Sequence, residues 1–397
     1  MNMKLKKILS LVLLGAILSS CNSGGSPKSN SILSTDASQG KIIKYESPEH
    51  FLLGSVIKLK YLQSTEQGDK SNLLTINLSN GSSQKLSFAQ LVYLAGDFMG
   101  DPSTQIGGHS ADVNLKNFKT NFEIMSKAPA KDYLPSIISI VNEELQKNSS
   151  RIANHEPFDI PDDDNIRFNC ATGGGCNKVT FLTNFGLYMK LASKNYDHFG
   201  QDAIDSYLAG HQLALNQAKI AQNDNDLRIA YAYEAYADHF LTDLFASGHL
   251  RTPRRSIVDW CAYTPETVSS FLTKVMHDQD NQSGIYVTNQ AGKSWKTYGD
   301  KELYINDNSA SLKQALFVMQ KSVDQIYDVY RGSITPDQAY NQAKQELPNL
   351  QATNRDSRNN PALFKLESGK IYEYTDGRYS ELSNCLTTAI KYGYQYL

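Results

Sequence analysis

Apolar residues recur at helical spacing along most of the chain. The spacing occurs over the segments 48–62, 86–95, 133–146, 178–194, 201–222, 226–247 and 309–331. Side chains three and four positions apart share one face of a helix, so each segment predicts a helix with a buried face. After the first of these segments, the stretch 64–84 is rich in Asn, Ser and Gly and predicts a loop.

Alternation with a period of two, which is typical of a half-buried strand, is rare until the tyrosine-rich tail beyond Lys365. The expected fold class is therefore mainly α, a multi-helix domain with a C-terminal extension. We place the helical domain at 41–335 and the extension, packed on the core, at 336–397. The tyrosine-rich segments of the extension predict either a small sheet or a final helix.

The N-terminus has the pattern of a bacterial export signal. Lysines precede a short apolar run at 8–18, and the run is too short to span a membrane as a helix. The following Leu-Ser-Ser-Cys resembles a lipobox, in which the cysteine becomes the lipidated first residue. We expect a signal peptide at 1–20, a lipidated Cys21 and a flexible tether at 21–40. These features predict an exported lipoprotein at the outer membrane or cell surface, or one secreted beyond it.

The net charge of the chain is close to zero. The 39 basic and 41 acidic residues nearly cancel, so net charge indicates no electrostatic steering of nucleic acid or acidic lipid toward the protein.

Four cysteines remain after Cys21, and two disulfides fit an exported chain. The glycines between Cys170 and Cys176 favour that pair, which leaves Cys261 and Cys385 as the second. A thiolate metal site is the weaker alternative, because no second close cysteine pair exists.

The residues with the most chemical information lie near the end of the 226–247 segment. His239 and Asp243 are four positions apart and project from one helix face, where an imidazole and a carboxylate can bind one divalent ion. Gly248 is suited to a left-handed helix end that returns His249 to the same face. A solvated His/Asp pair is the plainer interpretation of the first two residues, and His249 weighs against it.

The spacing of His239, Asp243 and His249 resembles the central zinc motif of the bacterial phospholipase C and single-strand nuclease superfamily. Its members are all-helical enzymes that hold three zinc ions. His198, within Tyr-Asp-His-Phe, and His50, followed by Phe-Leu-Leu-Gly, resemble two further ligands of the family. The resemblance spans about 50–331, with long stretches that match no known motif.

The resemblance implies a role for each of these positions. His198, His239 and Asp243 would hold one zinc ion, and Asp243 would bridge to a second ion shared with His50. The family also has an aspartate that ligates zinc and orients or deprotonates the attacking water. Asp97 is the candidate for this catalytic residue.

A third zinc ion is implied between His249 and His277, together with an acidic residue. Asp280 is preferred over Asp278, because a separation of three keeps it on the His277 face of a helix. Asp101 is likewise the second choice after Asp97.

The sequence departs from the family at two points. Relatives use an N-terminal Trp as a ligand, whereas the mature chain would begin at a lipidated Cys21; Glu46 or Glu49 is a possible substitute because both are close to His50. Relatives also place the last acid four residues after the histidine, and here that position is Asn281.

The expected function is zinc-dependent phospholipase C activity, which cleaves glycerophospholipids such as phosphatidylcholine to diacylglycerol and a phosphorylated head group. The residues around the motif resemble a phospholipase C branch of the superfamily; they are Phe240-Leu-Thr-Asp and Ser247-Gly-His-Leu-Arg. In addition, a lipid anchor would hold the enzyme at a membrane. A zinc nuclease or 3′-nucleotidase is the close alternative. A metal-binding surface lipoprotein without catalysis is the third.

The other histidines and the arginines carry less information. His211 lies on an apolar helix face and is expected to be a satisfied core histidine, while His109 and His155 are expected in polar loops. The tyrosines at 231, 233 and 236 are expected to pack between helices. Arg251 and the arginines at 254 and 255 form either a phosphate contact or a solvated basic turn.

Overall fold

The computed structural model describes residues 47–161, 163–181 and 183–396. The predicted signal peptide, the tether, Cys21 and Glu46 lie outside the described residues. The described chain divides into two compact units, a larger one within 47–251 and 279–360 and a smaller one that includes 252–278 and 361–396. The predicted domains had a different boundary, at 335/336.

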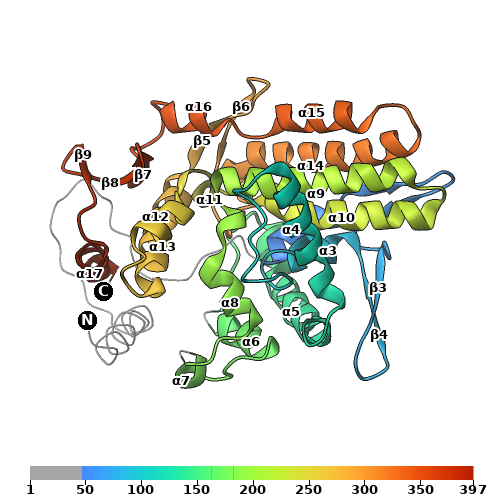
Figure 1. Ribbon diagram of the computed structural model, residues 1–397, viewed down its shortest axis with the longest axis horizontal. Coiled ribbons are helices and arrows are strands. Elements are labelled where there is room, and N and C mark those ends of the chain that lie inside the picture. Colours follow the sequence, from blue (N-terminus) through green and yellow to red (C-terminus); the bar gives the residue numbers. More distant parts are fainter. Residues whose placement is uncertain (1–46, 162, 182, 397) are drawn as a thin grey trace. The chain divides into compact units, whose positions relative to one another are not determined.

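Three long helices form the centre of the larger unit: α9 (Gly200–Ile220), α10 (Asp224–Asp243) and α14 (Ser309–Tyr330), which run side by side in Figure 1. Helix α10 begins at Asn223, whose side chain accepts hydrogen bonds from two backbone N–H groups of the first turn. Helices α9 and α10 approach closely at Gly210, where an added Cβ would lie 2.6 Å from the Ala237 Cβ. Small residues thus let the helix that carries His239 and Asp243 sit deep in the core.

Further helices surround this centre in the larger unit. They are α2 (Ser47–Ser55), α3 (Phe88–Leu94), α4 (Ala111–Glu123), α5 (Leu134–Ala153), α6 (Asp164–Ala171), α7 (Lys178–Phe181), α8 (Leu187–Lys194), α11 (Ser247–Arg251), α15 (Pro336–Glu346) and α16 (Leu350–Arg355). Four 3₁₀ turns are η1 (Ile124–Ser126), η2 (Ala130–Tyr133), η3 (Tyr196–His198) and η4 (Asn306–Asn308). Because α15 packs on α9 and α14, the chain up to 360 belongs to the larger unit.

Three antiparallel hairpins complete the larger unit. They pair β1 (Lys58–Lys60) with β2 (Thr65–Gln67), β3 (Leu74–Asn77) with β4 (Ser83–Leu86), and β5 (Ile285–Thr288) with β6 (Ser294–Thr297). The prediction of a loop over 64–84 was therefore wrong. The two strands that lie wholly within this stretch, β2 and β3, are short and mostly polar, and of their residues only Ile76 is buried, so the apolar alternation that marks a strand is weak there.

The smaller unit has its own apolar core. It contains α12 (Arg254–Trp260), α13 (Glu266–Ser283) as far as Asp278, the sheet β7 (Phe364–Glu367), β8 (Lys370–Thr375) and β9 (Arg378–Glu381), and α17 (Cys385–Tyr396). A disulfide joins Cys261 to Cys385 within this core. The tail thus forms both a small sheet, in the order β7-β8-β9, and a final helix.

The mainly α fold class is confirmed, and so are both disulfides, since Cys170 also bonds to Cys176. Most predicted helices agree with the structure in extent. The segment 178–194 is divided into α7 and α8, and the expected first helix ends at Ser55. None of the described helices has the length and apolar character needed to cross a membrane.

Candidate metal centre

Helix α10 delivers His239 and Asp243 to the interior of the larger unit, where both are fully buried. The helix ends at Asp243, and the buried turn 244–246 leads into α11, which carries His249. The prediction that Gly248 ends the helix in a left-handed conformation was wrong. Gly248 lies inside α11, and its backbone N–H donates to the Asn281 side chain.

His198 faces the α10 pair from η3. Its Nδ1 lies 2.9 Å from Asp243 Oδ2 and 3.2 Å from His239 Nε2. Asn195, in the left-handed conformation, ends α8 and begins this turn. His198, His239 and Asp243 form a group whose ligand atoms lie within 4.8 Å of one another, so these side chains can hold one metal ion.

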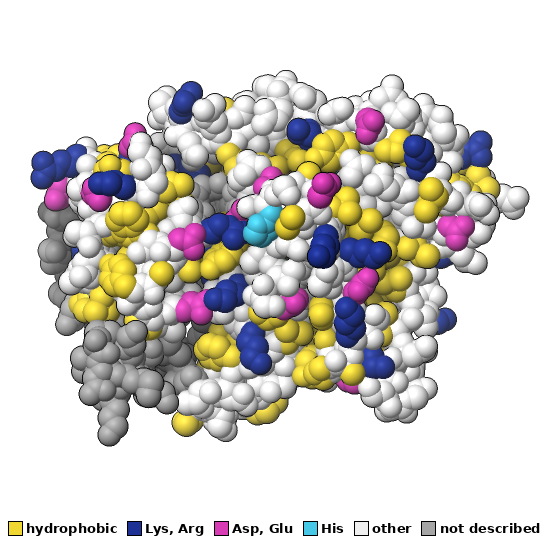
Figure 2. Space-filling view, viewed as in Figure 1, with side chains coloured by type: hydrophobic (Ala, Val, Ile, Leu, Met, Phe, Trp, Pro, Cys, Tyr) yellow, Lys and Arg dark blue, Asp and Glu magenta, His cyan; other side chains and the backbone are white. Residues whose placement is uncertain are grey.

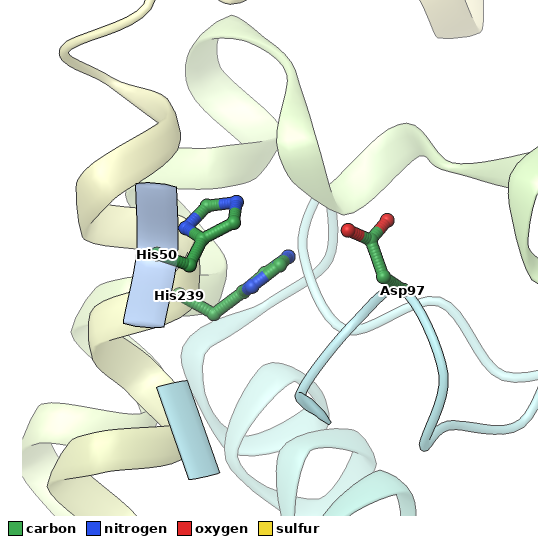
Figure 3. Close-up of side chains that lie close together, drawn as sticks. All are labelled: His50, Asp97 and His239. Carbon is green, nitrogen blue, oxygen red and sulfur yellow. The ribbon is translucent and has the colours of Figure 1, made fainter. Parts of the chain in front are cut away.

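A second group of possible ligands shares His239. It consists of His50 on α2, His239 on α10 and Asp97 in the turn after α3, which Figure 3 shows projecting toward one another. The His50 and His239 rings stack with centroids 4.3 Å apart. His50 Nε2 also lies 3.7 Å from Asp243 Oδ1, so the two groups adjoin. We call His50, Asp97, His198, His239 and Asp243 the His/Asp cluster.

Hydrogen bonds fix which ring nitrogens face the cluster. His239 Nδ1 lies 2.8 Å from the carbonyl oxygen of Val92, which can only accept, so Nδ1 carries the proton and Nε2 keeps a lone pair. His50 Nδ1 lies 2.8 Å from the Thr242 hydroxyl, and that hydroxyl donates to backbone carbonyls of α10. His50 Nε2 is thereby left as the acceptor. Such outer partners are typical of histidines that bind metal.

Gly96 allows the backbone to approach the cluster. Its φ is +64°, and an added Cβ would lie 2.8 Å from atoms of both His198 and His239. Because glycine has no Cβ, it can adopt the left-handed turn and also leaves space for the two imidazoles. The same turn presents Asp97, which is 3 % exposed.

His249 lies beside the cluster and has a carboxylate neighbour of its own. Its Nδ1 is 2.9 Å from the carbonyl oxygen of His198 and 3.6 Å from Asp243 Oδ1. Its Nε2 is 3.9 Å from an oxygen of Asp300, a residue that the sequence did not single out. The one sequence signal for such a residue was Asn281, which stands where the resemblance implies an acid.

Other predicted ligands have different surroundings. Both oxygens of Asp280 accept hydrogen bonds from the Arg251 guanidinium. Arg251 is therefore part of a buried ion pair and does not lie in a solvated basic turn. His277 lies on α13 in the smaller unit, with Nδ1 3.1 Å from Asp278 Oδ1. The assignments of His277 and Asp280 to a zinc ion stay predictions.

Asp101 and Glu49, the second-choice candidates, form hydrogen bonds with other groups. Asp101 accepts from Ser103 and Thr104, and these hydrogen bonds lower its pKa against the opposing effect of partial burial. Glu49 accepts from the backbone N–H groups of Lys301 and Leu303. Neither residue belongs to the two ligand groups of the His/Asp cluster.

The remaining histidines are where the sequence analysis expected them. His211 is buried on α9, with Nδ1 2.9 Å from a Glu234 carboxylate oxygen. His109 and His155 are exposed in loops. Tyr231 and Tyr236 are fully buried between helices.

A small pocket adjoins the cluster in the larger unit. Gly96, Asp101, Asn195, His198 and other residues line it, and its volume of about 20 Å³ accommodates a water molecule. On the face shown in Figure 2, acidic and basic side chains are interspersed, without a large area of one sign.

Comparison with protein-family models, curated proteins and solved structures finds no match to this chain.

Proposed function

We propose that the larger unit is a zinc-dependent hydrolase of phosphate esters and that its substrate is a glycerophospholipid, cleaved as by a phospholipase C. The observation that carries the proposal is the convergence of His50, Asp97, His198, His239 and Asp243. These residues come from four separate segments of the chain, and each was implied as a ligand by the zinc-motif resemblance.

The donor set supports zinc over magnesium or calcium. Imidazole nitrogens with one or two carboxylates are typical zinc ligands, whereas magnesium and calcium prefer oxygen ligands alone. The two groups share His239, and Asp243 faces both His198 and His50, as a bridging carboxylate would. Zinc bound here would polarise a phosphate ester and lower the pKa of water to about 7.

Asp97 is the proposed general base. Its buried carboxylate lies beside His50 and His239 and can accept the proton of an attacking water. The water-sized pocket reaches His198, in the adjoining ligand group, and is also lined by Gly96, the residue before Asp97. Asp97→Asn would keep the shape of the side chain and remove the proton acceptor.

A phospholipid is preferred as substrate because the residues around Phe240 and Ser247 resemble a phospholipase C branch and because a lipidated Cys21 would hold the enzyme at a membrane. A nuclease would use the same metals. The test is hydrolysis of a phosphatidylcholine analogue, single-stranded DNA and 3′-nucleotides by the zinc-loaded protein. Activity on the lipid analogue that is lost in Asp97→Asn supports the proposal, and activity confined to nucleic acid or nucleotides contradicts the lipid assignment.

A further inference from the structure

Asp300 lies in the loop between β6 and η4. None of the motifs predicted from the sequence includes it. We propose that Asp300 is the carboxylate ligand of the metal site that includes His249, in place of the acid expected after His277. The inference rests on the proposed metal function but not on the choice of substrate.

The distance between the two side chains fits a shared ion. His249 Nε2 and Asp300 Oδ1 are 3.9 Å apart, and two ligand atoms each about 2 Å from one zinc ion lie roughly 3–4 Å apart. His249 Nδ1 lies 2.9 Å from the carbonyl oxygen of His198, so Nδ1 carries the proton and Nε2 is the acceptor. Both side chains are nearly inaccessible to solvent, where a carboxylate requires a charge partner.

Asn281 orients Asp300. Its side-chain NH₂ donates to Asp300 Oδ2 at 3.0 Å, and its carbonyl oxygen accepts from the Gly248 N–H at 2.6 Å. One amide thus connects the loop of Asp300 to the helix that carries His249. An aspartate at 281 would instead place a second carboxylate against Asp300, so the amide and Asp300 suit each other.

Glu49 holds the same loop from the other side. Its two carboxylate oxygens accept from the N–H groups of Lys301 and Leu303, at 2.9 and 3.0 Å, and its side chain is fully buried. Glu49 directly precedes His50 on α2. This helix therefore presents one predicted ligand, His50, and also fixes the loop that carries Asp300. Glu49 is therefore a positioning residue for Asp300 rather than a ligand.

The sequence-based candidate, Asp280, has a different partner. Arg251 Nε and Nη2 donate to its two oxygens, and both residues are buried. Binding of a metal by Asp280 would require this two-point ion pair to break and leave the arginine buried without it, which is costly.

The experiment measures bound zinc per chain in the full protein after loading with zinc and removal of excess metal. Wild type is compared with Asp300→Asn, Asp280→Asn and the control Asp307→Asn, which makes the same change at an exposed position of η4. We expect Asp300→Asn to lose one zinc equivalent, or to bind it at least about 10-fold more weakly, and Asp307→Asn to match wild type. Thermal unfolding in EDTA, equal for the variant and wild type, shows that the fold is kept.

If Asp300→Asn does not fold, Glu49→Gln provides the second measurement. We expect it to weaken zinc binding by roughly 10- to 100-fold, as for other residues that orient ligands. The inference is overturned if Asp300→Asn keeps every equivalent at wild-type affinity, or if only Asp280→Asn loses one. A wild-type protein that binds no zinc would instead contradict the proposed function.

Discussion

Nε2 of His239 lies 3.2 Å from Nδ1 of His198. His239 Nδ1 faces the Val92 carbonyl oxygen, so the proton resides there and Nε2 presents a lone pair. His198 Nδ1 also lies 2.9 Å from Asp243. Two imidazoles and a carboxylate in this arrangement are well placed to share one cation.

Gly96→Ala should weaken metal binding. The added Cβ would lie 2.8 Å from both His198 and His239 and would displace them. Gly81→Ala is the matched control, because Gly81 also has a positive φ of 86° but has no atom near its Cβ position. Zinc titration of both variants should give at least about 10-fold weaker binding for Gly96→Ala alone. Equal affinities would show that the turn does not constrain the ligands.

Removal of metal should lower the stability of the fold. A ligand present at 1,000 times its dissociation constant stabilises the native state by about 4 kcal/mol, and chelation abolishes this contribution. Differential scanning calorimetry with zinc and with EDTA should therefore give a midpoint several degrees lower in EDTA. The same midpoint under both conditions would indicate that the cluster binds no zinc in the native state.

His211→Leu should destabilise the protein without affecting its metal content. His211 is the imidazole partner of the buried Glu234 carboxylate, and loss of one partner of a buried pair costs about 3 kcal/mol or more. His109→Leu, in an exposed loop, should have little effect. Urea unfolding and zinc content measure the two properties separately. Loss of zinc in a folded His211→Leu protein would refute its assignment as a core histidine.

The two disulfides should contribute unequally to stability. Cys261 and Cys385 are 124 positions apart and Cys170 and Cys176 only 6, so loop-closure entropy predicts about 5 and about 2 kcal/mol respectively. Replacement of each pair by serines, followed by urea unfolding, tests this order. A larger loss from the Cys170/Cys176 pair would contradict the entropic explanation.

The sequence predicted the parts of the cluster that local pattern determines. His239 and Asp243 share a helix face because of their spacing, whereas His198 and His50 were predicted only because the short segments around them resemble those of a zinc-enzyme superfamily. Asp300 could not be found in this way, because a tertiary loop held by Glu49 and Asn281 brings it to His249.

Errors in the predicted fold have a similar origin. The hairpins within 64–84 are short and polar, and they are stabilised by pairing with partners rather than by an apolar face of their own. The Gly248 prediction treated the glycine as a helix end, whereas Asn281 binds its N–H and the chain turns earlier, at 244–246. Both features depend on contacts distant in sequence.

Zinc content of the Asp243→Asn variant is the most direct test of the proposed metal centre. One carboxylate oxygen of Asp243 contacts His198 and the other lies near His50. The Asp243→Asn protein should therefore bind at least one zinc equivalent less than wild type. Asp112→Asn, exposed on α4, is the control and should match wild type. Elemental analysis of the three zinc-loaded proteins should give bound zinc in wild type and in Asp112→Asn, and less in Asp243→Asn. Zinc-free wild type, or an Asp243→Asn protein with the full wild-type content, would contradict the account.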